Sequence, residues 1–445
     1  MTEVKNLAWK TEYDAKKTTH SEAVKCVKSG DRVYAGTASS VAYGLLDALW
    51  ERRRELENVE IQSSQAFEPC ALYNEYENNP FGINTYFIGV NERKMYRHGM
   101  PVRYTSVHLS QVEIWAGENA KPNVCFFEVS LPDENGNFSF GPSGVACQRA
   151  LTEATKAIGG TVVLEVNPKV PYVFGEGNLI NLSEADMLVE YERAIMSYET
   201  PAGDEVAKKI SDYIIAEVPD GATIQLGLGN ISTEIGYGLM TKNDLGIHTE
   251  LFNQPMLDLI ENGNVTNRAK GYMDGKSVYS FSLGTEKLYG FLDRNPDMYC
   301  VPFAVANDAR NIARNRRMIS INSTMSIDLF GQCASECMAW NQQSGTGGQL
   351  DFVRGAQWSE GGKSFIATTS TFVKNGKLAS KIVPAFAAGS VVTTPRSDVQ
   401  YVATEYGCVN LKPLSMGDRV RALIGLAHPQ FRDALRDEAK AHGLI

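Results

Sequence analysis

The stretch Leu245-Gly246-Ile247-His248-Thr249-Glu250-Leu251-Phe252-Asn253-Gln254-Pro255 decides how the rest of the chain is interpreted. Residues 246–252 are apolar and β-branched enough for a buried strand end. Asn253 is a typical helix N-cap, and Pro255 fits the first turn of the helix that follows. Glu250 therefore falls near the carboxyl end of a strand, where open α/β sheets bind their ligands. On position alone, its carboxylate is either a site residue or a charge favoured by the helix dipole.

The composition limits the class of protein. The chain has 445 residues, of which 43% are hydrophobic and 21% charged, as in an ordinary globular protein. This length is too great for one compact core, so we expect two domains. The net charge of −9 argues against nucleic acid or an anionic membrane as a partner. Because no apolar run is long enough to span a bilayer and no leader pattern is visible at the start, we expect a cytoplasmic protein.

The cysteines do not form a metal-binding pattern. Eight cysteines are scattered along the chain, and only Cys333 and Cys337 lie close together. No histidine accompanies this pair, which makes it a poor zinc motif. We therefore expect buried free thiols and no metal.

A succession of helix, strand, glycine turn and helix occurs twice. The first copy has its strand at 32–36 and the second at 223–226, followed by Gly36 and Gly227 respectively. The order and spacing of the elements predict an internal duplication of an α/β half. Between the copies, apolar runs such as 124–129 read as buried parallel strands joined by helices.

The domain boundary is expected at a proline- and glycine-containing stretch, Thr200-Pro201-Ala202-Gly203. This position divides the chain into domains 1–200 and 201–445. Further β-runs are expected in the second domain at 364–367 and 390–394.

The glycine turn after the second repeated strand is not a known nucleotide motif. In Gly227-Leu228-Gly229-Asn230, the third glycine of a dinucleotide fingerprint is replaced by Ser232. The chain also has no P-loop and no G-x-S-x-G nucleophile elbow. Such a turn either serves packing or presents backbone N–H groups to an extended ligand.

Residues 246–250 resemble the nucleophile motif of the family I CoA-transferases, in the acetyl-CoA hydrolase/transferase branch. Four further stretches are similar to that branch: 138–143, 318–323, 345–352 and 392–410. The resemblance implies two similar open α/β domains of the CoA-transferase (NagB/RpiA-like) kind, with the active site in the cleft between them. It also implies a homo-oligomer. The enzymes that it most resembles move CoA between acetate and butyrate or 4-hydroxybutyrate.

The resemblance makes Glu250 the catalytic nucleophile. A glutamate with an ordinary pKa of about 4.3 is ionised at pH 7, so it can attack a thioester without a general base. The expected reaction is ping-pong: an acyl-glutamyl anhydride forms first, then a glutamyl-CoA thioester, and a second carboxylate reverses the sequence. CoA is then a substrate, and no other cofactor is expected.

Further site residues are implied by the same resemblance. The backbone N–H groups of Leu228 and Gly348 would form the oxyanion hole, where losing one donor typically costs about 3–4 kcal/mol of barrier. Asn307 matches a position that contacts the catalytic glutamate, although a loop asparagine that caps a helix is an equal alternative. His248 is interpreted as structural, with substrate orientation as the alternative. The residues expected to bind CoA are Gln225, Leu226, Gly227, Leu228, Gly229, Met325 and Gly348.

Three departures from the family pattern leave the acyl group open. Asn253-Gln254-Pro255 follows the nucleophile motif, Asn230 stands where many relatives have glycine, and Glu360 stands where a lysine near CoA is expected. Two other functions also stay open: a CoA-thioester hydrolase on the same scaffold, and a non-catalytic module that binds CoA or a sugar phosphate. The hydrolase differs only in admitting water, which depends on the shape of the site.

Overall fold

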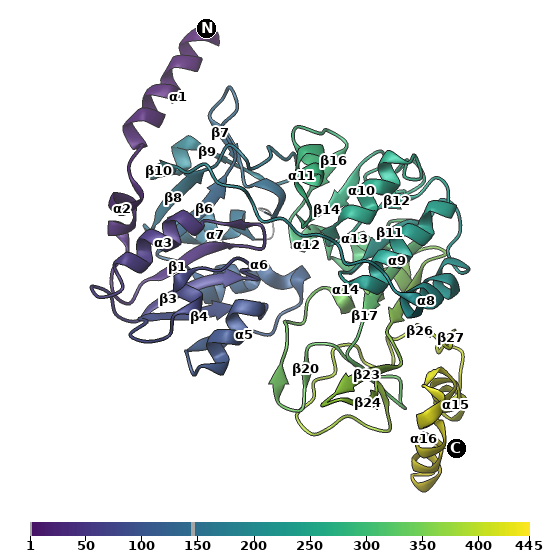
Figure 1. Cartoon of the computed structure of the whole chain (residues 1–445). Coiled ribbons are helices and arrows are strands. Elements are labelled where there is room, and N and C mark those ends of the chain that lie inside the picture. Colours follow the sequence, from purple (N-terminus) through teal and green to yellow (C-terminus); the bar gives the residue numbers. More distant parts are fainter. Residues whose placement is uncertain (1, 144–146) are drawn as a thin grey trace. The chain divides into compact units, whose positions relative to one another are not determined.

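The computed structural model describes residues 2–143 and 147–445, and the chain folds into two compact units (Figure 1). Unit 1 comprises the residues up to 198 together with 278–305, and unit 2 comprises 199–277 and 306–445. The division near residue 200 lies at the proline- and glycine-containing stretch. Segment 278–305, which the sequence analysis placed in the second domain, belongs to unit 1 instead.

Backbone hydrogen bonds explain why segment 278–305 joins unit 1. The N–H of Arg294 donates to the carbonyl of Tyr172 (2.8 Å), and the N–H of Cys300 donates to the carbonyl of Phe174 (3.0 Å). These bonds join residues more than 100 positions apart, so no local pattern in the sequence reveals them.

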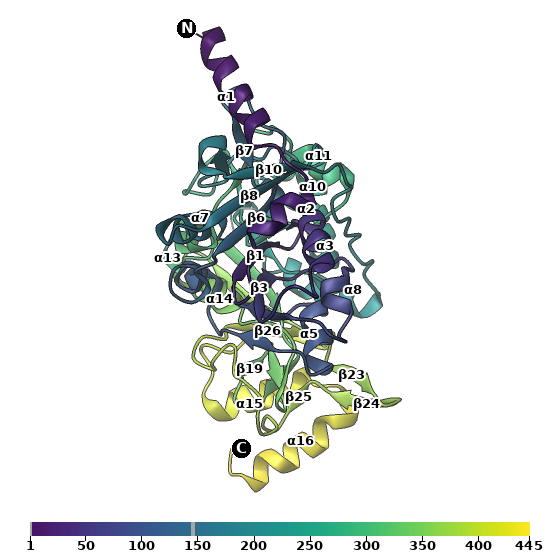
Figure 2. The same ribbon diagram turned by 90° about the vertical axis from the view of Figure 1, so that its left-hand side faces the viewer.

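Unit 1 is built on a parallel sheet with the strand order β10-β8-β6-β1-β3-β4-β5, to which β2 adds as an antiparallel neighbour of β1. Figure 2 shows β10, β8, β6, β1 and β3 following one another across this sheet, with α7 on one side and α2 and α3 on the other. Strand β6 is buried along its whole length, as expected for a parallel strand that is covered on both faces. The strands of the sheet are β1 (Arg32–Thr37), β2 (Ser40–Val41), β3 (Val59–Ser64), β4 (Phe81–Thr85), β5 (Val102–Tyr104), β6 (Val124–Val129), β8 (Thr161–Val166) and β10 (Met187–Glu190).

The other elements of unit 1 are helices and short strands. The helices are α1 (Thr2–Lys16), α2 (His20–Ala23), α3 (Tyr43–Glu51), α4 (Ala71–Asn74), α5 (Val90–Arg97), α6 (Val112–Ile114), α7 (Gln148–Ala157) and α11 (Glu286–Leu292). The short strands are β7 (Asn137–Ser139), β9 (Leu179–Asn181), β15 (Phe281–Ser282) and β16 (Met298–Cys300). Two elements, β14 (Ser277–Tyr279) and α12 (Phe303–Ala306), lie where the chain passes between the units.

Unit 2 has a second, mostly parallel sheet with the strand order β12-β11-β17-β22-β26-β27. Only β27 is antiparallel to its neighbour. The chain runs from β11 to β12 on one side and returns to β17 on the other, so the strand order reverses between β11 and β17. The carboxyl ends of strands at such a reversal form the crevice in which open α/β sheets bind ligands. The strands are β11 (Thr223–Leu226), β12 (Gly246–Ile247), β17 (Met318–Ser323), β22 (Lys363–Ala367), β26 (Tyr401–Thr404) and β27 (Gly407–Asn410).

Helices and short hairpins complete unit 2. The helices are α8 (Glu205–Ile215), α9 (Asn230–Gly238), α10 (Gln254–Glu261), α13 (Ala309–Ala313), α14 (Gln349–Trp358), α15 (Met416–Leu426) and α16 (Pro429–Ala441). The short strands are β13 (Leu251–Phe252), β18 (Ser326–Asp328), β19 (Cys333–Ala334), β20 (Cys337–Met338), β21 (Asn341–Gln342), β23 (Thr371–Lys374), β24 (Lys377–Ser380) and β25 (Ile382–Val383). Among the described residues, we find no helix with the length and apolarity that a membrane span requires.

The two units confirm the prediction of two open α/β sheets, with differences in detail. Gly36, which the repeat places after its strand, lies inside β1 and has a φ of 115°, whereas the glycine with this conformation near β11 is Gly229, three residues after the strand ends, with a φ of 112°. Gly36 and Gly227, which the predicted repeat pairs, therefore do not occupy equivalent positions. The predicted strand at 390–394 is wrong: only Thr394 forms a bridge, to Cys333.

Candidate active site

Glu250 lies at the carboxyl edge of the sheet in unit 2. Strand β12 pairs with β11 through Ile247 and Ile224, and the last hydrogen bond of this pair runs from the N–H of His248 to the carbonyl of Ile224 (3.3 Å). The predicted continuous strand 246–252 is thus interrupted after β12, and Glu250 lies in the gap before β13. This break releases its side chain from the sheet and leaves it partly exposed.

Two groups hold the carboxylate of Glu250. The Nδ2 atom of Asn307 donates to Oε2 of Glu250 at 2.8 Å, and the backbone N–H of Gly348 also stabilises the charged form. Gly348 is the N-cap of α14, so the carboxylate faces the positive end of a helix. The nucleophile predicted from the sequence therefore lies at a helix N-terminus, where two donors favour its charged form.

Position 348 has no room for a side chain. A Cβ atom there would lie 2.0 Å from Nδ2 of Asn307 and 2.1 Å from Oε2 of Glu250. Glycine is thus required for the backbone of α14 to approach the carboxylate. The sequence analysis expected this close approach, and the structure brings Glu250, Asn307 and Gly348 together.

The pKa of Glu250 differs from the expectation. Burial raises this pKa to about 7, the donors Asn307 and Gly348 lower it, and the negative charge of Asp351 in the first turn of α14 raises it. The sequence analysis took the glutamate to have an ordinary pKa and full ionisation at pH 7. In the structure, the pKa of this carboxyl group lies well above that of an ordinary glutamate, because desolvation disfavours the charged form.

Asn307 donates to the glutamate and is not the N-cap of the helix that follows it. Helix α13 begins two residues later, and its N-cap is Asp308, whose carboxylate accepts from the N–H groups of Arg310 and Asn311. The alternative of a helix-capping Asn307 is therefore wrong.

The residues predicted to bind CoA include one group at the end of β11 and another, at Met325, beyond β17. Gln225 and Leu226 are buried, and the amide of Gln225 accepts from the N–H of Ile321 (3.1 Å), so its side chain joins β11 to β17. The loop 227–229 follows, with Leu228 39% exposed. Asn253, the N-cap of α10, donates to the carbonyl of Gly227 (3.4 Å) and ties this loop to the segment that carries Glu250.

Met325 lines a pocket just beyond the carboxyl end of β17. This pocket has a volume of about 340 Å³. Its lining combines thioether and aromatic side chains with hydroxyl groups and one ammonium group, that of Lys381. The lining residues are Ser323, Thr324, Met325, Ser335, Met338, Phe372 and Lys381. By contrast, Glu360 is exposed, and its carboxylate lies 4.0 Å from Arg316.

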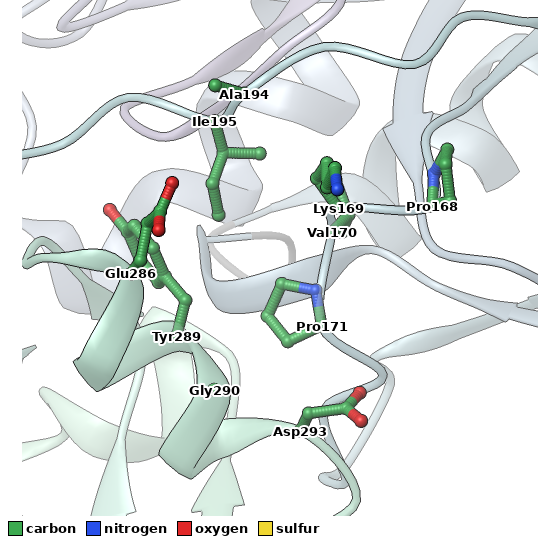
Figure 3. Close-up of a pocket in the computed structure, with 10 residues that line it drawn as sticks. All are labelled: Pro168, Lys169, Val170, Pro171, Ala194, Ile195, Glu286, Tyr289, Gly290 and Asp293. Carbon is green, nitrogen blue, oxygen red and sulfur yellow. The ribbon is translucent and has the colours of Figure 1, made fainter.

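A second pocket, in unit 1, contains none of the predicted site residues. It has a volume of about 350 Å³ and lies between loop 168–171, residues 194–195 and helix α11 (Figure 3). Proline and aliphatic side chains line it, with charged groups such as Glu286 and Asp293 around them. Within the described ranges 2–143 and 147–445, no cluster of three or more potential metal ligands occurs.

The sequence analysis missed Lys270. This side chain is fully buried, and its Nζ atom donates to the carbonyls of Ile247 (2.8 Å) and Lys276 (2.6 Å). Burial lowers its pKa to about 7. A Cβ at Gly246 would lie 2.3 Å from Cγ of Lys270, so the glycine of the motif makes room for this lysine. A glycine inside a β-branched run was the one available signal of such an approach.

Comparison with known proteins agrees with this geometry. The acetyl-CoA hydrolase/transferase N-terminal domain matches residues 1–216, and the C-terminal domain of the same family matches residues 284–439. The chain belongs to the acetyl-CoA hydrolase/transferase family.

Relatives from this family match along the whole chain. The succinyl-CoA:cyclohexane-1-carboxylate CoA transferase of Geobacter metallireducens is 37% identical over 99% of both chains. The butyryl-CoA:acetate CoA-transferase of Anaerostipes caccae is 35% identical over 98% of both. The crystal structure of RipA from Yersinia pestis superimposes with a TM-score of 0.91 at 35% identity and covers 98% of this chain and 99% of that one. Family members with hydrolase names are more distant.

Proposed function

We propose that this protein transfers CoA from an acyl-CoA to a free carboxylate, with Glu250 as the nucleophile. The observation that carries the proposal is the carboxylate of Glu250, held by Asn307 and by the N-terminus of α14 at Gly348. The names of the full-length relatives support acyl groups from acetyl to butyryl and succinyl, and a cyclic carboxylic acid as an acceptor.

The reaction that this site favours has two covalent stages. The ionised Glu250 attacks the thioester carbonyl, which gives an acyl-glutamyl anhydride and the CoA thiolate. The thiolate then attacks the glutamyl carbonyl and releases the first acid, which leaves a glutamyl-CoA thioester. A second carboxylate attacks this thioester and, by the reverse steps, leaves as the new acyl-CoA.

The donors around Glu250 support the role of oxyanion stabilisation. When CoA attacks the glutamyl carbonyl, negative charge develops on an oxygen of the Glu250 carboxyl group itself. The Asn307 amide and the Gly348 N–H already lie against that group, so they need no reorganisation as the charge develops. The N–H of Leu228, in the partly exposed loop after β11, stays the predicted second donor.

CoA is proposed to bind along the carboxyl edge of the sheet in unit 2. Loop 227–229 and the pocket at Met325 follow β11 and β17, the two strands between which the strand order reverses. An apolar lining with hydroxyl groups and the ammonium of Lys381 suits a thioether- and amide-containing arm that carries phosphates. Homo-oligomerisation and a cytoplasmic location stay predictions.

The hydrolase is the alternative on the same scaffold, since water could intercept either covalent intermediate. The transferase is favoured because the relatives matched over the full length carry transferase names.

Intact-protein mass spectrometry after incubation with acetyl-CoA, without an acceptor acid, tests the proposal. We expect an adduct of the mass of CoA less one water, which maps to the Glu250 peptide and is absent from Glu250→Gln. Exchange of CoA onto added butyrate should follow in the native protein alone. Steady release of free CoA thiol without an adduct would favour the hydrolase, and neither adduct nor thiol from any short-chain acyl-CoA would refute both.

A further inference from the structure

Two hydrogen bonds link the segment that carries Glu250 to the segment that carries Asn307. Nε2 of His248 donates to the carbonyl of Ala306 (2.8 Å), and two residues further along, Oε2 of Glu250 accepts from Nδ2 of Asn307 (2.8 Å). His248 precedes Glu250 by two positions, and Ala306 directly precedes Asn307. The two bonds therefore lie next to each other and hold these two segments together. We call this pair of hydrogen bonds the ladder.

His248 is confined to a single role by its surroundings. Its side chain is fully buried, and its ring lies 5.9 Å from that of Tyr272 and 6.3 Å from that of Phe352. Among the described residues, Nδ1 has no hydrogen-bond partner. Because Nε2 already binds Ala306 and no part of the ring is exposed, the alternative that His248 orients a substrate is wrong.

Burial and a neighbouring positive charge keep the imidazole of His248 neutral. Burial and the positive charge of Lys270 lower the pKa of His248 to about 3, and Asp274 acts on Lys270 in turn. The neighbouring charge at Glu250 is Asp351. A neutral imidazole carries one N–H, and the contact with Ala306 fixes it on Nε2.

We propose that His248 is a positioning residue that holds the amide of Asn307 against Glu250 by anchoring the backbone of Ala306. The expected effect of His248 on turnover rests on the CoA transfer proposed above. Its expected effect on the pKa of Glu250 rests on the geometry alone. A side-chain amide at the end of a loop can leave its acceptor, and the anchored carbonyl one residue earlier restricts that movement. Losing the anchor therefore weakens a bond that stabilises the charged nucleophile.

A matched pair of variants tests the ladder. His248→Gln keeps an N–H donor at the end of an unbranched side chain, whereas His248→Met has nearly the same length and no donor. The ionisation of Glu250 is followed by ¹³C NMR in protein labelled with [5-¹³C]glutamate, with Glu250→Gln to assign the signal. This measurement needs no turnover. The ascending limb of kcat/KM against pH is measured in parallel.

The expected results follow from the loss of a charge-assisted hydrogen bond. Asn307→Ala should raise the pKa of Glu250 by about one unit or more, and His248→Met should raise it by a comparable amount. The double variant should show no further shift, because both changes remove the same bond. His248→Gln should recover most of the native value, and kcat/KM below the pKa should fall about tenfold for each unit of upward shift.

Three results would overturn the proposal: an unshifted Glu250 in His248→Met, a double variant whose shifts add, or equal behaviour of the Gln and Met variants. A variant with a lower melting temperature but an unshifted Glu250 would show a purely structural histidine. If His248→Met does not fold, His248→Phe keeps the ring contacts and also lacks the donor. Absence of the CoA adduct in native protein would refute the proposed function, while the NMR titration would still decide the ladder.

Discussion

At Glu250, two physical demands oppose each other. A nucleophile whose covalent intermediates must not be hydrolysed needs a site that excludes water. Desolvation, however, raises the pKa of the Glu250 carboxyl group to about 7. Asn307 and Gly348 offset part of this cost by donating to the carboxylate. The balance gives the proposed nucleophile a raised pKa of about 7, with two donors that favour its charged form.

The first prediction is the pH dependence of the reaction. Only the deprotonated Glu250 attacks, and its pKa is raised to about 7, so kcat/KM should rise about tenfold per pH unit below 7 and level off above it. Initial rates of CoA exchange from pH 5.5 to 9, with an acyl-CoA that has no ionisable acyl group, check this. A profile that is flat between pH 5.5 and 7 would show that Glu250 has an ordinary pKa in the working enzyme.

The second prediction concerns the glycine that faces Glu250. Gly348→Ala places a methyl group about where the amide of Asn307 and the carboxylate of Glu250 now lie, so one of them must move. We expect kcat to fall by a factor on the order of 100 or more, the usual cost of losing an oxyanion donor.

Gly425→Ala is the matched control for that substitution. Gly425 lies in α15, and a Cβ there meets no atom within 4 Å, so activity should be unchanged and the helix slightly stabilised. Near-native kcat in Gly348→Ala would contradict the arrangement of the three residues around the carboxylate.

At the scale of elements, the N-cap of helix α10 connects the segment that carries Glu250 to the loop after β11. Asn253 caps α10 by accepting from the N–H of Met256 (3.4 Å), and its Nδ2 donates to the carbonyl of Gly227 (3.4 Å). One side chain thus ends the segment that carries Glu250 and holds the turn proposed to contact CoA. The departure from the family pattern at Asn253-Gln254-Pro255 has a structural role, although it leaves acyl specificity open.

The third prediction separates these two roles of Asn253. Asn253→Ala should lose the cap, which costs about 1 kcal/mol of stability, and should raise the KM for acyl-CoA severalfold because the loop is released. Asn253→Asp keeps an acceptor for the cap but cannot donate to Gly227, so it should retain stability and still raise KM. Thermal unfolding and steady-state kinetics measure both effects. A native KM in the Asp variant would show that the loop does not depend on this tether.

The sequence predicted those elements whose own residues specify them, and it failed where packing against distant segments decides the structure. Strands β6 and β11 have the predicted bounds, because buried runs between turn residues specify parallel strands. The break between β12 and β13 was not predicted, since His248 and Thr249 are compatible with a strand and only packing against distant segments ends it. The run 390–394 has strand-like residues, but among the described residues its backbone bonds to other strands only at Cys333 and Cys337, at the starts of the two-residue strands β19 and β20, which is too little for a regular strand pairing.

At the scale of the whole chain, only part of the site could be predicted from the sequence. A resemblance of motifs identified Glu250, Asn307 and Gly348, which the structure brings together from three segments of unit 2. Lys270 and the bond between His248 and Ala306 could not be found that way. Their importance comes from burial and from backbone carbonyls, and a sequence shows neither. For the same reason, segment 278–305 was assigned to the second domain, although backbone hydrogen bonds join it to Tyr172 and Phe174 of unit 1.

The last prediction concerns how the free energy of unfolding of unit 1 depends on pH. Glu92, in α5 of unit 1, is fully buried; its Oε1 accepts from the N–H of Ala66 (3.4 Å), and burial raises its pKa to about 7. In an unfolded chain, a glutamate has a pKa of about 4.3. Between these two values the folded state binds more protons than the unfolded one, so the free energy of unfolding falls as pH rises, by up to about 3 kcal/mol.

Glu92→Gln removes this titration and keeps an acceptor for Ala66. Urea unfolding at pH 5 and pH 8 should therefore show the variant gaining stability relative to the native protein as pH increases. Because each unit has its own sheet and core, unfolding can occur in two steps, and only the transition of unit 1 should respond to this substitution. A difference between variant and native protein that stays constant from pH 5 to pH 8 would mean that Glu92 is ionised in the folded state throughout this range, and that its buried site is hydrated.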